Sequence, residues 1–468
     1  MSRYEQFKAL VAEAAEKFKK IGLDENIRIV SHLDSDGICA CSILVRSLKN
    51  ENRRYSISIV HQLDVNVLQE LSNEQHNCFV FADLGSGQLS NIERFLSGKS
   101  VFILDHHQPE LSKTNVCHVN PHLCGVDGSS EISGAGVAYL FACALNKKNM
   151  DLAHLALIGA MGDLQEKNGF HDLNAEILQH AKRIGTIKVS QGIRVFGSQT
   201  RPVHKLLEYS TDPYIPGVSG SESAAIQFLC GIGINPKRGK DWKKLLHLTE
   251  EERQRLAAAI ILRRSKETNP EDIFGFTYLL VAEPEESPLK DAKEFSTLLN
   301  ACGRMNKASL GIGACIGNKE SKQKAIQQLA LYRKEILAAL KWYQDNKSKR
   351  HVYKEDGFVI INAQDFVPFT FIGTLASILS KSKEFAEPTF ILSMAYNNDC
   401  TIKASLRMSG RSKADLRSLV SEIVKYSGGE AGGHQNAAGA LVPIDNEEKL
   451  ISAAKEVLRK ACMIEEVI

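Results

Sequence analysis

Five short apolar runs in the first 120 residues constrain the fold of this 468-residue chain most. The runs have five to seven residues, are rich in Val, Ile and Phe, and alternate with helix-length polar or amphipathic segments. This pattern predicts an α/β fold in which helices cover both faces of a parallel sheet. Ligands of such sheets bind beyond the carboxyl ends of the strands. The runs are 27–31, 56–60, 78–84, 100–105 and 116–120.

The pattern of strand-like and helical segments along the chain predicts four parts. Residues 319–346 contain neither Gly nor Pro and are expected to form one long connector helix. After it, the strand-like segments "GFVIIN", "TFILSMAY" and "CTIKASLRM" alternate with helical ones, which indicates a second, smaller α/β domain. The expected parts are a first α/β domain at 1–190, a mostly helical middle insertion at 191–318, the connector helix at 319–346 and the second domain at 347–468.

Composition narrows the class of protein. The net charge of +3 is too small to indicate a nucleic-acid-binding protein by itself. The 11 cysteines include no Cys-x-x-Cys pair, so neither a zinc ribbon nor a disulfide framework is expected. No stretch of about 18 apolar residues occurs, and the N-terminal segment carries charges throughout. We therefore expect a soluble, cytoplasmic protein without a membrane partner.

Acidic and imidazole side chains stand where three of the apolar runs and one helical segment end. Any single aspartate among them could simply cap a helix or fill a turn. Together, however, they should meet at one edge of one sheet. Oxygen and nitrogen ligands without thiolates suit Mn²⁺ or Mg²⁺, and two such ions about 3.5 to 4 Å apart hydrolyse phosphoesters. The set comprises His32, Asp34, Asp36, Asp83, Asp105, His106, His107 and Asp163.

These segments resemble a known family. "SHLDSDG", "FADLGSG", "LDHHQPE" and "GAMGD" resemble, in order, the four motifs of the DHH phosphoesterases. "GGEAGGHQNAAGA" at 428–440 resembles the signature of the DHH-associated domain. "TRPVHKLLEYSTDPYIPG" and "EFSTLLNACGRMNKASLG" look like segments of the archaeal RecJ-like nucleases, which include the GINS-associated nuclease. The resemblance implies a catalytic DHH domain and a substrate-binding DHH-associated domain.

The resemblance also implies roles for the acidic and imidazole residues. His107 would contact the scissile phosphate, because adjacent residues of an extended segment point to different sides. Asp105 would orient a histidine, although it could equally be a simple turn residue. Asp83 would bridge two ions, Mn²⁺ or Mg²⁺. The implied metal ligands are His32, Asp34, Asp36, Asp83, His106 and Asp163.

The second domain and a basic segment supply candidate substrate contacts. Glycines allow close approach of the backbone to a phosphate, although an ordinary glycine turn would look the same. Residues 177–207 contain no acidic residue, so they either form a solvated face or guide a nucleic-acid strand by charge. The candidate contacts of the second domain are Arg407, Arg411, Gly432, Gly433 and His434.

The resemblance favours a metal-dependent exonuclease that acts on single-stranded DNA or RNA in replication or repair, in a cleft between the two domains. Two alternatives stay open. The first is a phosphodiesterase of very short oligonucleotides or cyclic dinucleotides. The second is a scaffold that binds GINS beside the replicative helicase. Neither strand polarity nor a preference for DNA or RNA follows from the sequence.

Overall fold

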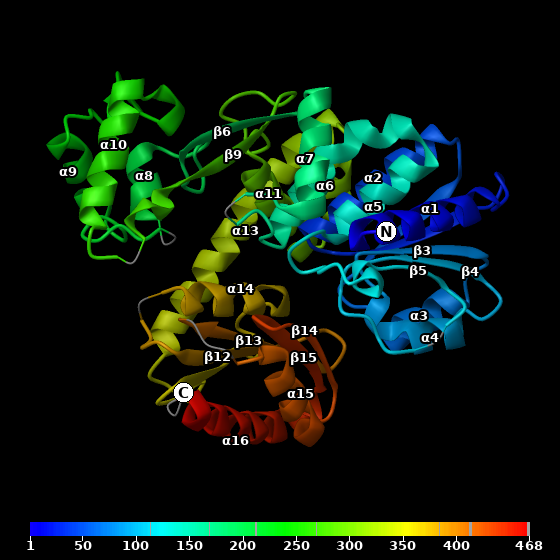
Figure 1. The fold of residues 1–468 in the computed structure, drawn as a ribbon. Coiled ribbons are helices and arrows are strands. Elements are labelled where there is room, and N and C mark those ends of the chain that lie inside the picture. Colours follow the sequence, from blue (N-terminus) through cyan, green and yellow to red (C-terminus); the bar gives the residue numbers. More distant parts are fainter. Residues whose placement is uncertain are drawn as a thin grey trace. The chain divides into compact units, whose positions relative to one another are not determined.

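The computed structural model consists of two compact units, Met1–Leu329 and Ala330–Ile468, each with its own sheet (Figure 1). None of the described helices is both long and apolar enough to cross a membrane. The described residues are 1–112, 114–167, 169–210, 213–267, 269–382, 384–410 and 414–465.

The sheet of the first unit has five strands in the order β2-β1-β3-β4-β5, and all neighbours are parallel. Every residue of β3 is buried, as is every residue of β1 except His32. Burial on both faces is typical of parallel sheets covered by helices. The predicted parallel sheet is therefore confirmed. Its strands are β1 (Ile27–His32), β2 (Tyr55–Val60), β3 (Cys78–Ala82), β4 (Ser100–Leu104) and β5 (Cys117–Val119).

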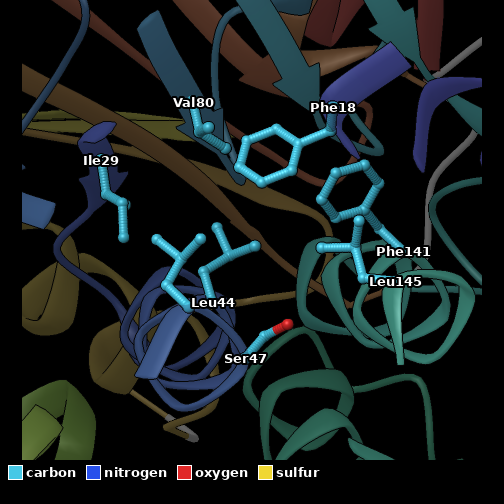
Figure 2. Close-up of a pocket in the computed structure, with 8 residues that line it drawn as sticks. Phe18, Ile29, Leu44, Ser47, Val80, Phe141 and Leu145 are labelled. Atoms are coloured by element: carbon cyan, nitrogen blue, oxygen red, sulfur yellow. The ribbon is translucent and has the colours of Figure 1, made fainter. Parts of the chain in front are cut away.

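Helices cover both faces of this sheet (Figure 1). Ile29 and Val80 pack on one face against Phe18 and Phe141, in a small apolar region that Figure 2 shows. Val30 faces the other side and joins a separate apolar cluster, because successive strand residues alternate in direction. The first face carries α1 (Arg3–Lys19), α2 (Ser35–Asn50) and α5 (Gly134–Leu145); the second carries α3 (Val65–Ser72) and α4 (Leu89–Phe95).

Beyond the sheet, the regular elements in the described part of the first unit are helices and two pairs of strands. The antiparallel ribbon of β6 (Ile187–Ile193) and β9 (Phe274–Leu280) brackets a subdomain with its own apolar cluster. That subdomain also contains the hairpin of β7 (Lys237–Arg238) and β8 (Asp241–Trp242). Neither pair was predicted from the sequence. The helices are α6 (Ala153–Gly162), α7 (Asp172–Ile184), α8 (Val203–Glu208), α9 (Glu222–Gly231), α10 (Glu250–Arg263), α11 (Ala292–Arg304) and α12 (Ala308–Cys315).

Helix α13 (Lys319–Asn346) runs from the first unit into the second. The second unit has a mixed sheet in the order β10-β11-β12-β13-β15-β14, in which only β11 and β12 are parallel neighbours. Its helices are α14 (Phe369–Ser380), α15 (Leu416–Ser427) and α16 (Glu447–Glu465). Its strands are β10 (Val352–Glu355), β11 (Phe358–Asn362), β12 (Thr389–Tyr396), β13 (Thr401–Ser409), β14 (Glu430–His434) and β15 (Ala437–Pro443).

Candidate metal centre

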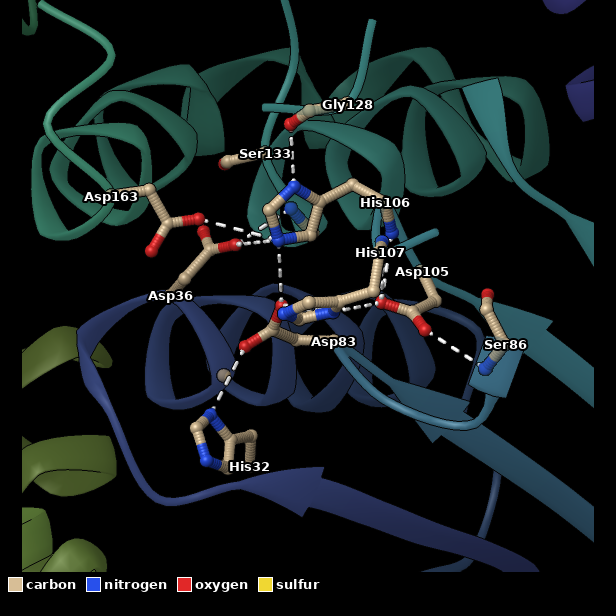
Figure 3. A network of polar contacts seen from close by, with 12 residues as sticks. His32, Asp36, Asp83, Ser86, Asp105, His106, His107, Gly128, Ser133 and Asp163 are labelled. Carbon is tan, nitrogen blue, oxygen red and sulfur yellow. Dashed lines mark hydrogen bonds and ion pairs between the residues drawn. The ribbon is translucent and has the colours of Figure 1, made fainter. Parts of the chain in front are cut away.

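The carboxyl edge of the first sheet brings all eight predicted acidic and imidazole residues together. Figure 3 labels all of them except Asp34. His32 ends β1, Asp83 follows β3 directly, and Asp163 follows α6. Possible ligand atoms lie within 4.8 Å of one another in three overlapping groups. The groups are Asp83, Asp105, His106 and His107; His32, Asp34 and Asp83; and Asp36, His106 and Asp163.

Asp83 belongs to two of these groups and is 1% exposed. Its φ of 60° lies in the left-handed region, which aspartate tolerates better than most residues and which often marks functional sites. Nε2 of His106 lies 3.3 Å from Oδ1 of Asp83, and Nδ1 of His32 lies 3.7 Å from Oδ2. Neither oxygen accepts a hydrogen bond from a described residue. A bound cation would satisfy these buried anionic oxygens, so the residues present fit a divalent metal.

The two carboxylate oxygens of Asp34 have different partners. Oδ1 accepts a hydrogen bond of 3.0 Å from the backbone N–H of Gly37 and so caps α2. Oδ2 lies 3.0 Å from Nδ1 of His32. Burial alone would raise the pKa of Asp34, but the attraction of His32 and the cap hold it well below its usual range. Asp34 is therefore a helix cap, and it also belongs to the cluster of acidic and imidazole side chains that could hold a metal ion.

Asp36 lies in the first turn of α2 and is fully buried, with its side chain against the N-terminus of α5. Its carboxylate accepts hydrogen bonds from the backbone N–H groups of Gly134 (2.6 Å) and Ala135 (3.0 Å), where the helix dipole favours negative charge. Burial and the negative charges of Asp83 and Asp163 nevertheless raise the pKa of Asp36 well above its usual value. Burial also raises the pKa of Asp163 to about 7. The site thus concentrates more negative charge than its own donors balance.

The two adjacent histidines have different surroundings. Nδ1 of His106 lies 2.6 Å from the carbonyl oxygen of Gly128, an acceptor that places the proton on Nδ1. Nε2 of the same ring then faces three carboxylates, at 3.3 Å from Asp83, 3.2 Å from Asp163 and 3.7 Å from Asp36. Burial alone would lower the pKa of His106, but these carboxylates raise it well above its usual value.

The side chain of His107 is 35% exposed, whereas that of His106 is 2% exposed, and Nδ1 of His107 lies 3.9 Å from Oδ1 of Asp83. Nδ1 of His107 lies 2.7 Å from Oδ1 of Asp105, and Oδ2 of Asp105 accepts a hydrogen bond of 2.9 Å from the backbone N–H of Ser86. Asp105 therefore orients the ring of His107. Burial alone would raise the pKa of Asp105, but the positive charge of His107 holds it well below its usual range.

Family comparisons agree with this arrangement. The model of the DHH family N-terminal domain matches residues 26–160, the DHH-CID domain matches 195–273 and the DHHA1 domain matches 357–460. An uncharacterized protein of Methanocaldococcus jannaschii is 31% identical over 445 residues, which cover 92% of this chain and 93% of that protein. The chain belongs to the DHH family. The predicted resemblance is thereby confirmed.

Solved structures show that the fold of this DHH protein is RecJ-like. CDC45 from Entamoeba histolytica aligns with a TM-score of 0.62 and 12% identity, over 98% of both chains. RecJ from Thermus thermophilus in complex with Mn²⁺ aligns with a TM-score of 0.58 and 15% identity, over 96% of this chain and 55% of that one. The same Thermus protein has also been solved in complex with Mg²⁺. The chain spans about half the length of this RecJ.

Small residues that the sequence analysis did not single out shape the DHH site. A Cβ atom on Gly159 would stand 2.3 Å from Oδ1 of Asp36, and one on Gly134 would stand 2.5 Å from Oδ1 of Asp83. Any larger residue at either position would push a carboxylate away. The only signal in the sequence is the run of small residues in "SGAGVA" and "IGAMGD".

The structure describes some of the substrate contacts that the sequence predicts in the DHHA1 domain. The guanidinium of Arg407 donates to Oγ of Ser377 (3.0 Å) and to the carbonyl oxygen of Leu406 (2.8 Å). Gly432 is exposed, and a Cβ atom there would meet nothing within 4 Å. Gly433, in β14, has a φ of 125°, so its own backbone conformation favours glycine. Two predicted contacts, Arg411 and the side chain of His434, lie outside the described residues.

Proposed function

We propose that the chain is a metal-dependent exonuclease that hydrolyses phosphodiester bonds of single-stranded DNA or RNA. The observation that carries this proposal is the convergence of carboxylates and imidazoles from four separate elements at one edge of the sheet, in three overlapping groups. The phosphoesterase and nuclease character of the DHH fold supports the same class of reaction. The identity of the nucleic acid and the role in replication or repair belong to the proposal.

We assign two ions, Mn²⁺ or Mg²⁺, to this site, with Asp83 as the shared ligand. The metals bound to the Thermus RecJ support this choice of ion. When bound, such ions would supply an activated water and would stabilise the leaving oxygen. Asp105 holds His107 so that Nε2 of the ring points away from the carboxylate, ready to donate to a phosphate oxygen or to the leaving group. The proposed ligands are His32, Asp34, Asp36, Asp83, His106 and Asp163.

We assign the terminal nucleotides of the substrate to the DHHA1 domain. The anchored guanidinium of Arg407 provides a fixed positive charge, and the exposed backbone at Gly432 leaves room for a phosphate. Gly433, Arg411 and His434 complete the proposed set. The acid-free segment 177–207 would attract the rest of the strand without reading its bases.

A second candidate function is a replisome scaffold. The match to CDC45 over 98% of both chains favours it, because the whole architecture is shared and not only the DHH domain. The proposed partners are GINS and the replicative helicase. The complete set of acidic and imidazole residues at the sheet edge argues that a scaffold would keep catalysis as well.

A time course on 5′- and 3′-labelled DNA and RNA strands, with Mn²⁺, Mg²⁺ or a chelator, tests the proposal. We expect stepwise shortening from one end with metal and none with chelator. Comparing a 20-mer with a dinucleotide separates an exonuclease from a phosphodiesterase of short substrates. Activity that survives in Asp83→Ala would refute the assigned site. A pull-down of GINS by the wild type and by Asp83→Ala would show whether binding and hydrolysis are separable.

A further inference from the structure

The β7–β8 hairpin is an exposed basic element that the metal centre does not use. Its six residues, 237–242, read "KRGKDW" and are all exposed. Lys237 pairs with Trp242 and Arg238 pairs with Asp241 across the two strands, and Gly239 turns the chain with a φ of 65°. The hairpin lies in the segment that matches the DHH-CID domain. Such a tight turn presents the charges of both strands together.

The positive charges of the hairpin are not neutralised within the described part of the protein. Among the described residues, no acidic group forms an ion pair with its three cations, Lys237, Arg238 and Lys240. The lysines that follow differ, because Lys243 pairs with Glu252 and Lys244 pairs with Glu286, each at 2.7 Å. The hairpin therefore offers three cations against one acid, Asp241, to an anionic partner.

The side chain of Trp242 is held in place from within the protein. Its ring centroid lies 4.1 Å from that of His204, which is 2% exposed. The backbone N–H of Val203 donates to the carbonyl oxygen of Lys243 (2.8 Å), which fixes α8 beside the hairpin. Trp242 nevertheless remains 36% exposed, and the ammonium of Lys237 lies 5.0 Å from its ring. A supported and exposed indole among these cations combines an aromatic stacking surface with an anion-binding one.

We propose that this hairpin binds the single-stranded nucleic acid outside the metal centre, with a base stacked on Trp242 and phosphates held by the three cations. The proposal rests on the proposed function, since it assigns a second contact for the same substrate. A base stacks on an indole more strongly than an exposed ammonium does, so it can displace Lys237, which is then released to bind a phosphate. Stacking and charge together read no sequence. An acidic protein segment would use the charges but would not need the indole.

The two tryptophans of the chain make a direct test possible. Trp342 stacks on Phe366 in the second unit, so Trp342→Phe keeps an aromatic ring there and leaves Trp242 as the sole indole. In this background, with chelator, we expect oligothymidylate to quench the fluorescence of Trp242. The single variant Trp242→Leu keeps an apolar side chain that cannot stack, so it should bind a 20-mer about tenfold more weakly than the wild type. The variant Trp242→Phe should lose less affinity.

Charge removal gives an independent readout. The affinity falls as salt rises, and replacing Lys237, Arg238 and Lys240 by alanine should make this dependence weaker. The magnitude of the slope of log affinity against log salt should decrease by about 2, because each phosphate contact on a single strand contributes about 0.7. Replacing three exposed lysines elsewhere should change the slope less, and serves as the matched control: Lys20, Lys147 and Lys148. The ratio of kcat/KM for a 20-mer to that for a dinucleotide should fall about tenfold in Trp242→Leu.

Several results would overturn this inference. Unchanged fluorescence, or equal affinities of Trp242→Leu and the wild type, would exclude stacking. Equal quenching by polyglutamate would show a docking surface for acidic protein instead. The proposed function fails separately: strands that quench Trp242 but are never cleaved would remove the nuclease and leave the binding site. If strands are cleaved and the hairpin variants change neither binding nor cleavage, the nuclease stands and the hairpin binding site is refuted.

Discussion

Gly134 lies so close to Asp83 that a Cβ atom on the glycine would stand 2.5 Å from Oδ1 of the carboxylate. The backbone N–H of the same glycine donates to Oδ2 of Asp36 at 2.6 Å. The first residue of α5 thus touches both carboxylates that we place at the centre of the site. The helix can hold the two negative charges near each other only because no side chain stands between them.

We predict that Gly134→Ala loses most of the metal response. The added methyl group has to displace the carboxylate of Asp83 or shift α5, at a cost of about 1–3 kcal/mol in stability. Differential scanning fluorimetry with and without Mn²⁺ measures both effects. Gly22→Ala is the control, because a Cβ atom there would meet nothing within 4 Å. A variant whose response to Mn²⁺ equals that of the wild type would contradict the close approach.

Asp83→Asn should separate metal binding from folding. The substitution keeps the volume but removes a buried charge whose oxygens accept no hydrogen bond from a described residue. We expect the Tm in EDTA to stay close to that of the wild type, because the relieved repulsion from Asp36 offsets the lost attraction to His32 and His106. Mn²⁺ at about 100 times its Kd should stabilise the wild type by about 2.7 kcal/mol and the variant hardly at all. A full metal shift in Asp83→Asn would remove this residue from the ligand set.

How much the sequence reveals depends on whether the signal is local. The strands of the first sheet and the acidic residues at their ends are readable, because each follows a short apolar run and parallel strands share one edge. Asp34 caps α2 through one oxygen and faces His32 through the other, so its role as a helix cap does not account for the whole side chain.

The missed features depend on distant partners or on very short elements. The strands β6 and β9 pair across some 80 intervening residues, and β6 contains Ser190, Gln191 and Gly192, which weaken a strand pattern. The β7–β8 hairpin has only two residues in each strand. Gly159 looks like an ordinary small helical residue until the fold brings Asp36 against it.

Asp105→Asn should slow the reaction without releasing the metal. An amide in place of the carboxylate keeps the bond to the backbone of Ser86 possible but no longer holds the proton on Nδ1 of His107. We expect kcat to fall about 10- to 100-fold, while the thermal shift caused by Mn²⁺ persists. If Asp105→Asn lost both the activity and the thermal shift caused by Mn²⁺, Asp105 would instead be a metal ligand.

A buried chain of amides should set the metal affinity through His106. The side chain of Gln165 donates to the carbonyl oxygen of Gly128 (2.9 Å), which also accepts from His106, and Asn174 donates to Gln165 (2.7 Å). Gln165→Leu frees that carbonyl to move, so the affinity for Mn²⁺ measured by calorimetry should drop about tenfold. Gln69→Leu, on the exposed surface of α3, is the control. Equal affinities would show that the ring of His106 needs no outer support.

The pH dependence of stability should carry a contribution from Glu294, which lies outside the metal centre. Its side chain is 2% exposed and accepts hydrogen bonds from the backbone N–H of Gln199 (3.2 Å) and from Oγ1 of Thr200 (2.6 Å). Burial raises its pKa from the ordinary value of 4.5 to about 7, against the lowering effect of Thr200. The folded state therefore keeps the proton at pH values where the unfolded chain has released it.

The sign of the effect follows from this difference. Between pH 4.5 and about 7 the folded state binds more protons than the unfolded state, so the free energy of unfolding falls as the pH rises. The difference in pKa corresponds to a loss of up to about 3 kcal/mol across this window. Glu294→Gln cannot titrate, so its urea-unfolding free energy should lose this slope and exceed that of the wild type at pH 8. Parallel pH profiles for the two proteins would show that Glu294 is ionised without cost in the folded state.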